Sequence, residues 1–297
     1  MTGNEDGLTL VELMVVLMLA AVVTAVIYQT FPAQQKAAIS QEQVTEMQQQ
    51  VRAAMHIMTR EIRMAGYNPL RVTSNASCGT WILTAKNDEI RFAMDVTGGE
   101  SDGVDNDGDG EIDELDEEAD GDCNDKNETI TYLLYTDADG IQTLGRRYSL
   151  SESAEDEEKK EEKETTYSIA ENIEAVGFAY AFDADGDGTL DKANPHDDGP
   201  MWAVDNNSDG ELDLNLDTNH DGEVDELDNP AGVPLYPTIP LDAIRAVKIW
   251  LLGRSEQPDT NFTNNTTYAV ANQRITVNDG YRRRLLSTTV YCRNMGL

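Results

Sequence analysis

Acidic side chains recur at fixed intervals in four short stretches of this chain, and their spacing is that of an oxygen cage for a metal ion. In a loop of the form D-x-D-x-D-G, side chains at positions 1, 3, 5, 9 and 12 and the backbone carbonyl of position 7 can surround one cation. Glycine at position 6 permits the sharp turn, and an aliphatic residue at position 8 anchors the loop to its neighbour. The first stretch supplies Asp105, Asp107, Asp109, Glu111, Asp113 and Asp116 in this order.

Three further stretches repeat the pattern. The second loop has Asp183, Asp185, Asp187, Thr189 and Asp191, with Asn194 at position 12. The third has Asp205, Asn207, Asp209, Glu211 and Asp213, with Leu216 at position 12. The fourth, which follows it directly, has Asp217, Asn219, Asp221, Glu223, Asp225 and Asp228. Position 8 is aliphatic every time, as Ile112, Leu190, Leu212 and Val224.

These ligand sets favour Ca²⁺. Hard oxygen donors without cysteine, and with His220 only at a non-ligand position, suit Ca²⁺ better than Zn²⁺. The loops resemble EF-hand-like and dockerin-like calcium loops, and the first and fourth are the most complete. None has a bidentate glutamate at position 12, so we expect structural sites with Kd on the order of 10⁻⁴–10⁻³ M. The alternative is a set of solvated acidic linkers or an adaptation to salt.

The negative charge is concentrated in a few segments. Lys and Arg number 22 and Asp and Glu 56 in 297 residues, a formal charge of −34. Residues 101–126, 152–164 and 183–228 hold 37 of the carboxylates, which leaves the rest of the chain close to neutral. Residues 152–164 lack the loop pattern and are expected to form a solvated loop or a short exposed helix. An acidic chain of this kind is not expected to bind nucleic acid.

The N-terminal residues 8–27 form an apolar run that contains a single charge, Glu12. A helix of this length spans about 30 Å, the hydrocarbon thickness of a bilayer. A carboxylate in such a run is costly and normally has a partner. After Pro32, apolar residues recur at helical spacing as far as Ala65, so an amphipathic helix is expected to continue to Gly66. A cleaved signal peptide and a plain membrane anchor are alternatives, but both leave Glu12 unexplained.

The sequence from Gly7 to Glu12 resembles the processing site of type IV pilins and type II secretion pseudopilins. The resemblance implies that a prepilin peptidase cuts after Gly7 and methylates the amine of Leu8. It also implies that Glu12 meets the terminal amine of a neighbouring subunit during assembly, which would offset the cost of burying its carboxylate. Other pilins, the peptidase and the inner membrane are then the expected partners.

The neutral segments predict strands, and a helix followed by antiparallel strands gives an α+β fold. The predicted strands are 80–85, 89–95, 129–136, 141–150, 173–182, 243–252 and 281–292. The predicted division is a leader at 1–7, a transmembrane and spine helix at 8–66 and a β-rich domain at 67–297. Residues 62–67, 170–180, 244–247 and 284–294 resemble PilW-type minor pilins, and the related GspJ-type pseudopilins share the spine and a similar sheet domain.

The favoured function is a structural one: a PilW-type minor pilin that helps initiate or cap a type IV pilus, first in the inner membrane with its globular domain in the periplasm, then on the cell surface. A GspJ-like pseudopilin and a calcium-dependent adhesion module on a pilin anchor remain open. No H-E-x-x-H, G-x-S-x-G or P-loop motif is present, so an enzyme is not expected. Of the three cysteines, Cys78 and Cys123 are the favoured disulfide pair, with Cys292 left on a strand.

Overall fold

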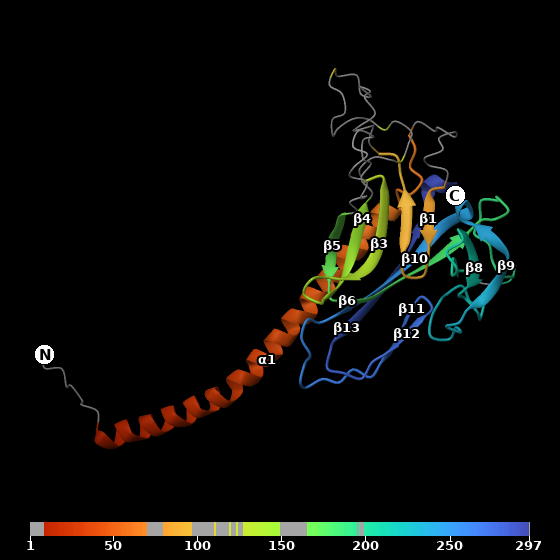
Figure 1. Cartoon of the computed structure of the whole chain (residues 1–297). Coiled ribbons are helices and arrows are strands. Elements are labelled where there is room, and N and C mark those ends of the chain that lie inside the picture. Colours follow the sequence, from red (N-terminus) through yellow and green to blue (C-terminus); the bar gives the residue numbers. More distant parts are fainter. Residues whose placement is uncertain are drawn as a thin grey trace, which may run out of the picture. The chain divides into compact units, whose positions relative to one another are not determined.

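The computed structural model of the chain describes residues 9–69, 80–96, 127–148, 165–194 and 199–296, together with Gly110, Ala119, Cys123 and His196. The chain divides into two compact units, Met1–Glu46 and Met47–Leu297. The first unit contains most of the helix α1, and the second contains the end of that helix and all the strands (Figure 1).

The helix α1 spans Leu10–Ile62 and is unbroken at Pro32. Its start is closed by a reciprocal cap: the backbone N–H and hydroxyl of Thr9 donate to Glu12 at 2.8 Å each, and the Glu12 N–H donates to the Thr9 hydroxyl at 3.3 Å. Apolar side chains from Leu10 to Ile27 are exposed in the isolated chain. This helix is long and apolar enough to cross a membrane.

The C-terminal part of α1 belongs to the core of the second unit. Met47, Val51, Met58 and Ile62 are buried at the three- and four-residue spacing of one helix face. After Ile62 the chain turns, and Gly66 takes a left-handed conformation with φ of 76°. The helix was predicted to end at Gly66, but its last helical residue is Ile62. Gly66 lies four residues later, in the turn that follows the helix.

The first sheet has five strands in the order β1-β2-β3-β4-β5, all antiparallel to their neighbours. Its strands are β1 (Ile82–Ala85), β2 (Ile90–Ala93), β3 (Thr129–Thr136), β4 (Gln142–Tyr148) and β5 (Thr165–Glu171). Glu61 of α1 joins the helix to this sheet, because it accepts hydrogen bonds from the Tyr132 hydroxyl at 2.5 Å and from Arg146 Nε at 2.9 Å.

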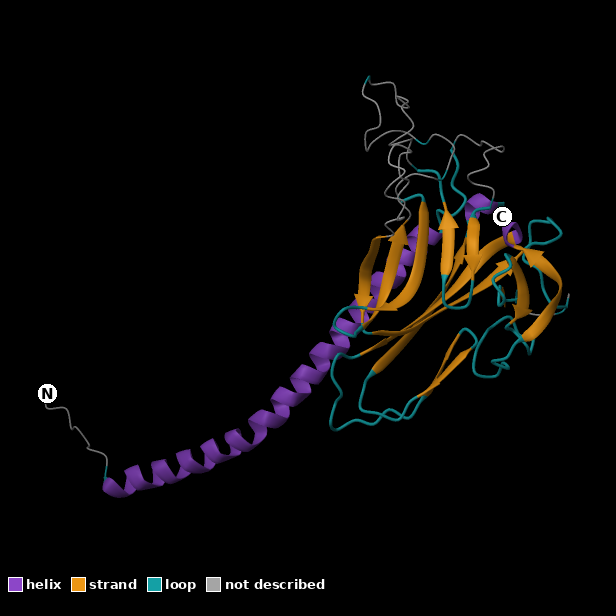
Figure 2. Ribbon diagram, in the orientation of Figure 1, coloured by secondary structure: helices purple, strands orange, loops and turns teal. Residues whose placement is uncertain are grey.

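The second sheet has six strands in the order β13-β10-β6-β7-β8-β9. Figure 2 distinguishes the strands, in orange, from the helix, in purple. Its strands are β6 (Ile173–Phe182), β7 (Ala203–Val204), β8 (Glu211–Asn215), β9 (Val233–Pro240), β10 (Ile244–Arg254) and β13 (Arg283–Tyr291). The central strands β6 and β10 are almost wholly buried, which explains their apolar sequences. Between β10 and β13 the chain forms a separate hairpin, β11 (Thr267–Val270) and β12 (Gln273–Thr276).

The predicted α+β class is confirmed: one long helix is followed by antiparallel sheets. All seven predicted strands are present within a few residues of their expected bounds. The prediction missed β5, β7, β8, β9 and the β11–β12 hairpin, because most of these lie in segments where acidic or turn residues interrupt the apolar alternation. The second unit begins at Met47, so the amphipathic end of α1 folds with the sheets.

Candidate metal centre

Three of the four predicted calcium loops lie in the described part of the chain, and each interrupts the β6–β9 half of the six-stranded sheet. We call them loop A (183–194), loop B (205–216) and loop C (217–228). Loop A follows β6, and loop B follows β7 and contains β8 as its second half. Loop C follows β8 directly and leads into β9. The remaining predicted ligands, Asp105, Asp107, Asp109, Glu111, Asp113 and Asp116, lie outside the described residues.

In loop A the first carboxylate is the centre of the turn. Asp183 Oδ1 accepts the N–H of Gly186 at 2.7 Å and of Asp187 at 3.2 Å, and Oδ2 accepts the N–H of Gly188 at 3.0 Å. Carboxylate oxygens of Asp183, Asp185 and Asp187 all lie within 4.8 Å of one another. Like charges at this separation repel one another, and a cation bound between them would offset the repulsion.

The far side of loop A is closed by the position-9 carboxylate. Asp191 Oδ2 accepts the N–H of Ala184 at 2.8 Å, which ties the end of the loop to its start. Thr189, at position 7, donates its N–H and hydroxyl to Asp187 at 2.8 Å and 2.6 Å. The predicted ligands of loop A are thus brought into one turn.

Loop B repeats the same bonds at the same positions. Asp205 accepts the N–H of Ser208 at 2.6 Å and of Gly210 at 3.0 Å. Asp213 at position 9 accepts the N–H at position 2, at 2.8 Å, as Asp191 does in loop A. The position-3 and position-5 residues, Asn207 and Asp209, are joined to each other, since the Asn207 amide donates to Asp209 at 2.8 Å. Glu211, at position 7, donates its N–H to Asp209 at 3.0 Å.

Loop C closes through position 12 instead of position 9. Asp217 accepts the N–H of Asp221 at 3.2 Å and of Gly222 at 2.9 Å, as the first residue does in the other loops. Asp228 Oδ1 then accepts the N–H of Thr218 at 2.7 Å, and its Oδ2 accepts the N–H of Asp225 at 2.9 Å. This loop has a carboxylate at position 12, where loops A and B have Asn194 and Leu216.

The backbone of the three loops has a common shape. Positions 4 and 6 are left-handed in each: Gly186 and Gly188, Ser208 and Gly210, His220 and Gly222, with φ between 63° and 87°. At position 8, Leu212 and Val224 are buried and Leu190 is partly buried, as an anchoring role requires. At Gly222 a Cβ atom would also collide with the backbone of Gly199. Both the left-handed conformation and the lack of space therefore favour glycine at this position.

The first carboxylates of loops A and C differ in electrostatics. Burial opposes the charge on Asp183, but the backbone N–H groups of Gly188, Gly186 and Asp187 outweigh it, so its pKa is lowered. Burial instead raises the pKa of Asp217, and the carboxylate of Asp228 raises it further, although the Gly222 N–H opposes both. The backbone N–H groups of loop C therefore compensate the buried charge of Asp217 less than those of loop A compensate the charge of Asp183.

Basic and aromatic side chains anchor loop C to the sheet and to the hairpin, and sequence reasoning missed all of them. The buried Lys248 pairs with Glu223 and lies 5.4 Å from the ring centres of both Trp202 and Trp250. Trp202 Nε1 donates to the Gly222 carbonyl at 2.8 Å. Arg274 of β12 donates to the carbonyls of Asp225 and Asp228. Trp202 lies 15 residues before the start of loop C, and the other three lie 20 or more residues after its end, so the spacing within the loop does not point to them.

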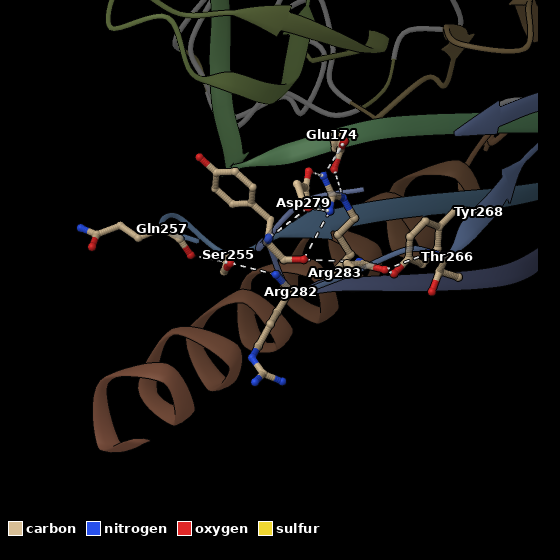
Figure 3. A network of polar contacts seen from close by, with 10 residues as sticks. Glu174, Ser255, Gln257, Thr266, Tyr268, Asp279, Arg282 and Arg283 are labelled. Carbon is tan, nitrogen blue, oxygen red and sulfur yellow. Dashed lines mark hydrogen bonds and ion pairs between the residues drawn. The ribbon is translucent and has the colours of Figure 1, made fainter. Parts of the chain in front are cut away.

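A second polar network surrounds Arg283, at the start of β13 (Figure 3). Its guanidinium makes two forked pairs, with Glu174 of β6 at 2.5 and 3.1 Å and with Asp279 at 2.6 and 2.7 Å. Only 2% of the Arg283 side chain is exposed. This network joins the connection between β12 and β13 to the sheet, and we assign it a structural role.

The structure describes only some of the residues that were predicted to act in assembly or to form the disulfide. Glu12 lies in the first turn of α1 and is exposed in the isolated chain, whereas Gly7 and Leu8 lie outside the described residues. Cys123 is disulfide-bonded, and Cys292 is a buried free thiol, as expected. Cys78, the favoured partner of Cys123, lies outside the described residues.

Three family models match successive parts of the chain. Residues 3–28 match the prokaryotic N-terminal methylation motif, residues 40–158 match prepilin peptidase-dependent protein B, and residues 202–294 match type IV pilus-assembly protein W. The predicted resemblance to PilW-type, type IV pilin-like proteins is confirmed by these matches. The motif and the apolar helix fit a membrane-anchored pilin, and the matched families are structural.

One solved structure that resembles the chain is a type IV-like pilin from Thermus thermophilus. It is 14% identical, and the alignment covers 84% of this chain and 97% of the pilin with a TM-score of 0.39. No curated protein sequence matches this chain significantly.

Proposed function

We propose that this chain is a minor pilin of PilW type, a structural subunit that helps initiate or cap a type IV pilus. The observation that carries the proposal is the order of features on one chain. A methylation-motif match precedes a membrane-length helix, and a match to pilus-assembly protein W covers the last strands. The chain would lie in the inner membrane with its globular unit in the periplasm before assembly, and at the pilus or cell surface afterwards.

The N-terminal residues would carry processing and assembly. A prepilin peptidase would cleave after Gly7 and methylate Leu8, and the new amine would meet Glu12 of a neighbouring pilin. The geometry of Glu12 supports this role, because its carboxylate is exposed at the start of α1 and bonded only to Thr9 among the described residues. In a bilayer that carboxylate needs a cationic partner.

The test is incorporation of the full chain into sheared pili. Glu12→Ala should abolish incorporation, whereas Glu42→Ala, a matched change at an exposed position of the same helix, should leave it unchanged. Mass spectrometry of the incorporated chain should find N-methylated Leu8 as its first residue. Recovery of Glu12→Ala in pili at the wild-type level, or an uncleaved N-terminus there, would contradict the proposal.

We further infer that loops A, B and C, and the loop at 105–116, bind Ca²⁺ as structural sites. Repetition of one hydrogen-bond pattern around positions 1 and 6 supports this inference, as does the 4.8 Å carboxylate cluster of loop A. The ion would replace like-charge repulsion by shared coordination, so the loops would be ordered when it is bound.

Calcium binding is tested by melting the full chain in detergent with Ca²⁺, with Mg²⁺ and with a chelator. At 10 mM Ca²⁺ and a Kd of about 10⁻³ M, one site contributes about 1.4 kcal/mol. The melting temperature should rise with Ca²⁺ and not with equal ionic strength of Na⁺. Asp187→Asn should reduce the rise, whereas Asp139→Asn, in an exposed turn outside the loops, should not. A melting temperature unaffected by millimolar Ca²⁺ would make the loops acidic linkers.

A further inference from the structure

The outer edge of β13 is the longest uninterrupted strand edge in the described part of the chain. β13 is the first strand in the six-stranded order and pairs with β10 over all nine positions, from Arg254 opposite Arg283 to Ala246 opposite Tyr291, without a register shift. No described strand pairs with its other side.

The register determines which backbone groups of β13 point to that free side. In an antiparallel pair, opposed residues alternate between those that exchange hydrogen bonds and those that do not. The bonds from Ser255 N–H to the Arg282 carbonyl and from Cys292 N–H to the Arg245 carbonyl, both 2.8 Å, identify the bonded pairs at the two ends. Counting inward by two, residues 284, 286, 288 and 290 face β10, and residues 283, 285, 287, 289 and 291 present N–H and C=O groups outward.

The other outer edges of the two larger sheets, β9, β1 and β5, carry features that hinder strand addition. β9 contains Pro234, Pro237 and Pro240 and pairs irregularly with β8. β1 has four residues and a register shift, and β5 is bulged opposite Leu144. Natural proteins protect sheet edges by such prolines, bulges and short strands, because open edges recruit other strands. β13 has nine residues, no proline and no bulge, so its outer edge is open to an added strand.

Charge identifies the kind of strand. Residues 281–297 carry four arginines and no carboxylate, in a chain of net charge −34. Arg284 on β13 and Arg293 just beyond it are exposed, and no described residue forms an ion pair with either. A second copy of β13 would offer these arginines no carboxylate, and it would bring two strongly acidic bodies together. The edge instead complements an extended segment that bears carboxylates.

We propose that the free edge of β13 receives an extended, acidic segment of a neighbouring, different subunit as a seventh strand of the sheet. This inference rests on the proposed function, because the neighbour is a filament partner. Main-chain hydrogen bonds from residues 285, 287 and 289 would supply affinity, and Arg284 would select for carboxylates.

The direct readout is hydrogen exchange of the amides of residues 283–291. The wild-type full chain is compared purified in detergent and in the native membrane and filament fraction of the producing cells. In the purified chain the outward amides of residues 285, 287 and 289 should exchange fast and the inward ones slowly. In the native fraction the outward amides should slow by about 100-fold or more, as expected for newly paired strand amides. Fast exchange of these amides in both samples would overturn the proposal without any variant.

The matched variants are Ser287→Pro and Ser287→Ala. Proline removes only the outward N–H, which β10 does not use, so the melting temperature of the purified chain should change little. Incorporation into pili should fall at least tenfold for Ser287→Pro and stay unchanged for Ser287→Ala. Arg284→Glu should weaken incorporation too, by repelling the acidic segment. If both Ser287→Pro and Arg284→Glu were incorporated into pili as well as the wild type, the proposal of strand addition at β13 would be refuted.

The two proposals fail in different ways. If the filament role is wrong, wild-type chain is absent from pili, while exchange in the membrane fraction still reports whether the β13 edge is occupied. If only the edge proposal is wrong, wild type enters pili in a Glu12-dependent manner, and the outward amides exchange fast there.

Discussion

Replacing Arg283 by methionine tests whether the network in Figure 3 holds the second unit together. Methionine keeps most of the length and apolar stem of the side chain and removes the guanidinium. The substitution deletes four charge-assisted hydrogen bonds, two to Glu174 and two to Asp279. It leaves two carboxylates without their common partner at the point where β13 begins.

The cost follows from the exposure of the three side chains. Removing one partner of a buried ion pair costs about 3–5 kcal/mol. Arg283 is 2% exposed, but Glu174 and Asp279 are 19% and 35% exposed, so water can partly solvate the carboxylates that remain. We therefore expect a loss of about 2–4 kcal/mol in the free energy of unfolding, or about 5–15 °C in melting temperature for a unit of this size.

The assay is thermal and urea unfolding of the full chain in detergent, followed by tryptophan fluorescence. Arg284→Met is the matched control: the neighbouring residue is exposed and should change stability by less than about 0.5 kcal/mol. A double-mutant cycle with Glu174→Gln should return a coupling of about 1 kcal/mol or more. A loss below about 1 kcal/mol for Arg283→Met, equal to that of Arg284→Met, would refute the assignment of Arg283 as a structural anchor.

Three further outcomes are expected. Trp202→Phe should cost about 1–3 kcal/mol and weaken the calcium-dependent rise in melting temperature, since it leaves the buried Gly222 carbonyl without its donor. Tyr132→Phe should cost about 1–2 kcal/mol in urea unfolding, by removing the hydroxyl that donates to Glu61. The hydrogen bond from Arg283 holds the pKa of Asp279 below its ordinary value of 3.8, so this carboxylate stabilises the fold above that pH and the contribution is lost as pH falls through the lowered pKa. Acidification from about pH 5 to pH 2 should therefore destabilise wild type more than Arg283→Met, and an equal loss would contradict that linkage.

The sequence predicts the helix and the apolar strands because their signals are local. The three- and four-residue spacing of Met47, Val51, Met58 and Ile62 gives the buried face of α1, and runs such as 244–252 give the central strands. The short strands β7 and β8 carry no such signal, since acidic loops flank them. Their pairing partners are set by loop geometry and by neighbours that are distant in sequence.

The anchors of loop C show the other limit. Lys248 is in the middle of an apolar strand, and Arg274 lies in a hairpin that the sequence does not indicate. Their contacts with loop C depend on how β10 and the hairpin pack beside it. Only the residues within a loop follow a spacing rule, so sequence reasoning finds candidate ligands and misses the residues that position them.

The acidic loops connect or include strands of the sheet, although their charge separates them from the neutral scaffold in the sequence. Positions 7 to 11 of loop B are the strand β8, which pairs with both β7 and β9. The backbone N–H groups of Asp183 and Asp205, the first residues of loops A and B, donate to the carbonyls of Ala243, just before β10, and Ala85, at the end of β1. A cation held in these loops would therefore fix the register of the sheet strands that leave them. Loss of the cation should first loosen β7, β8 and β9, at the side of the sheet opposite β13, and leave β6, β10 and β13 paired.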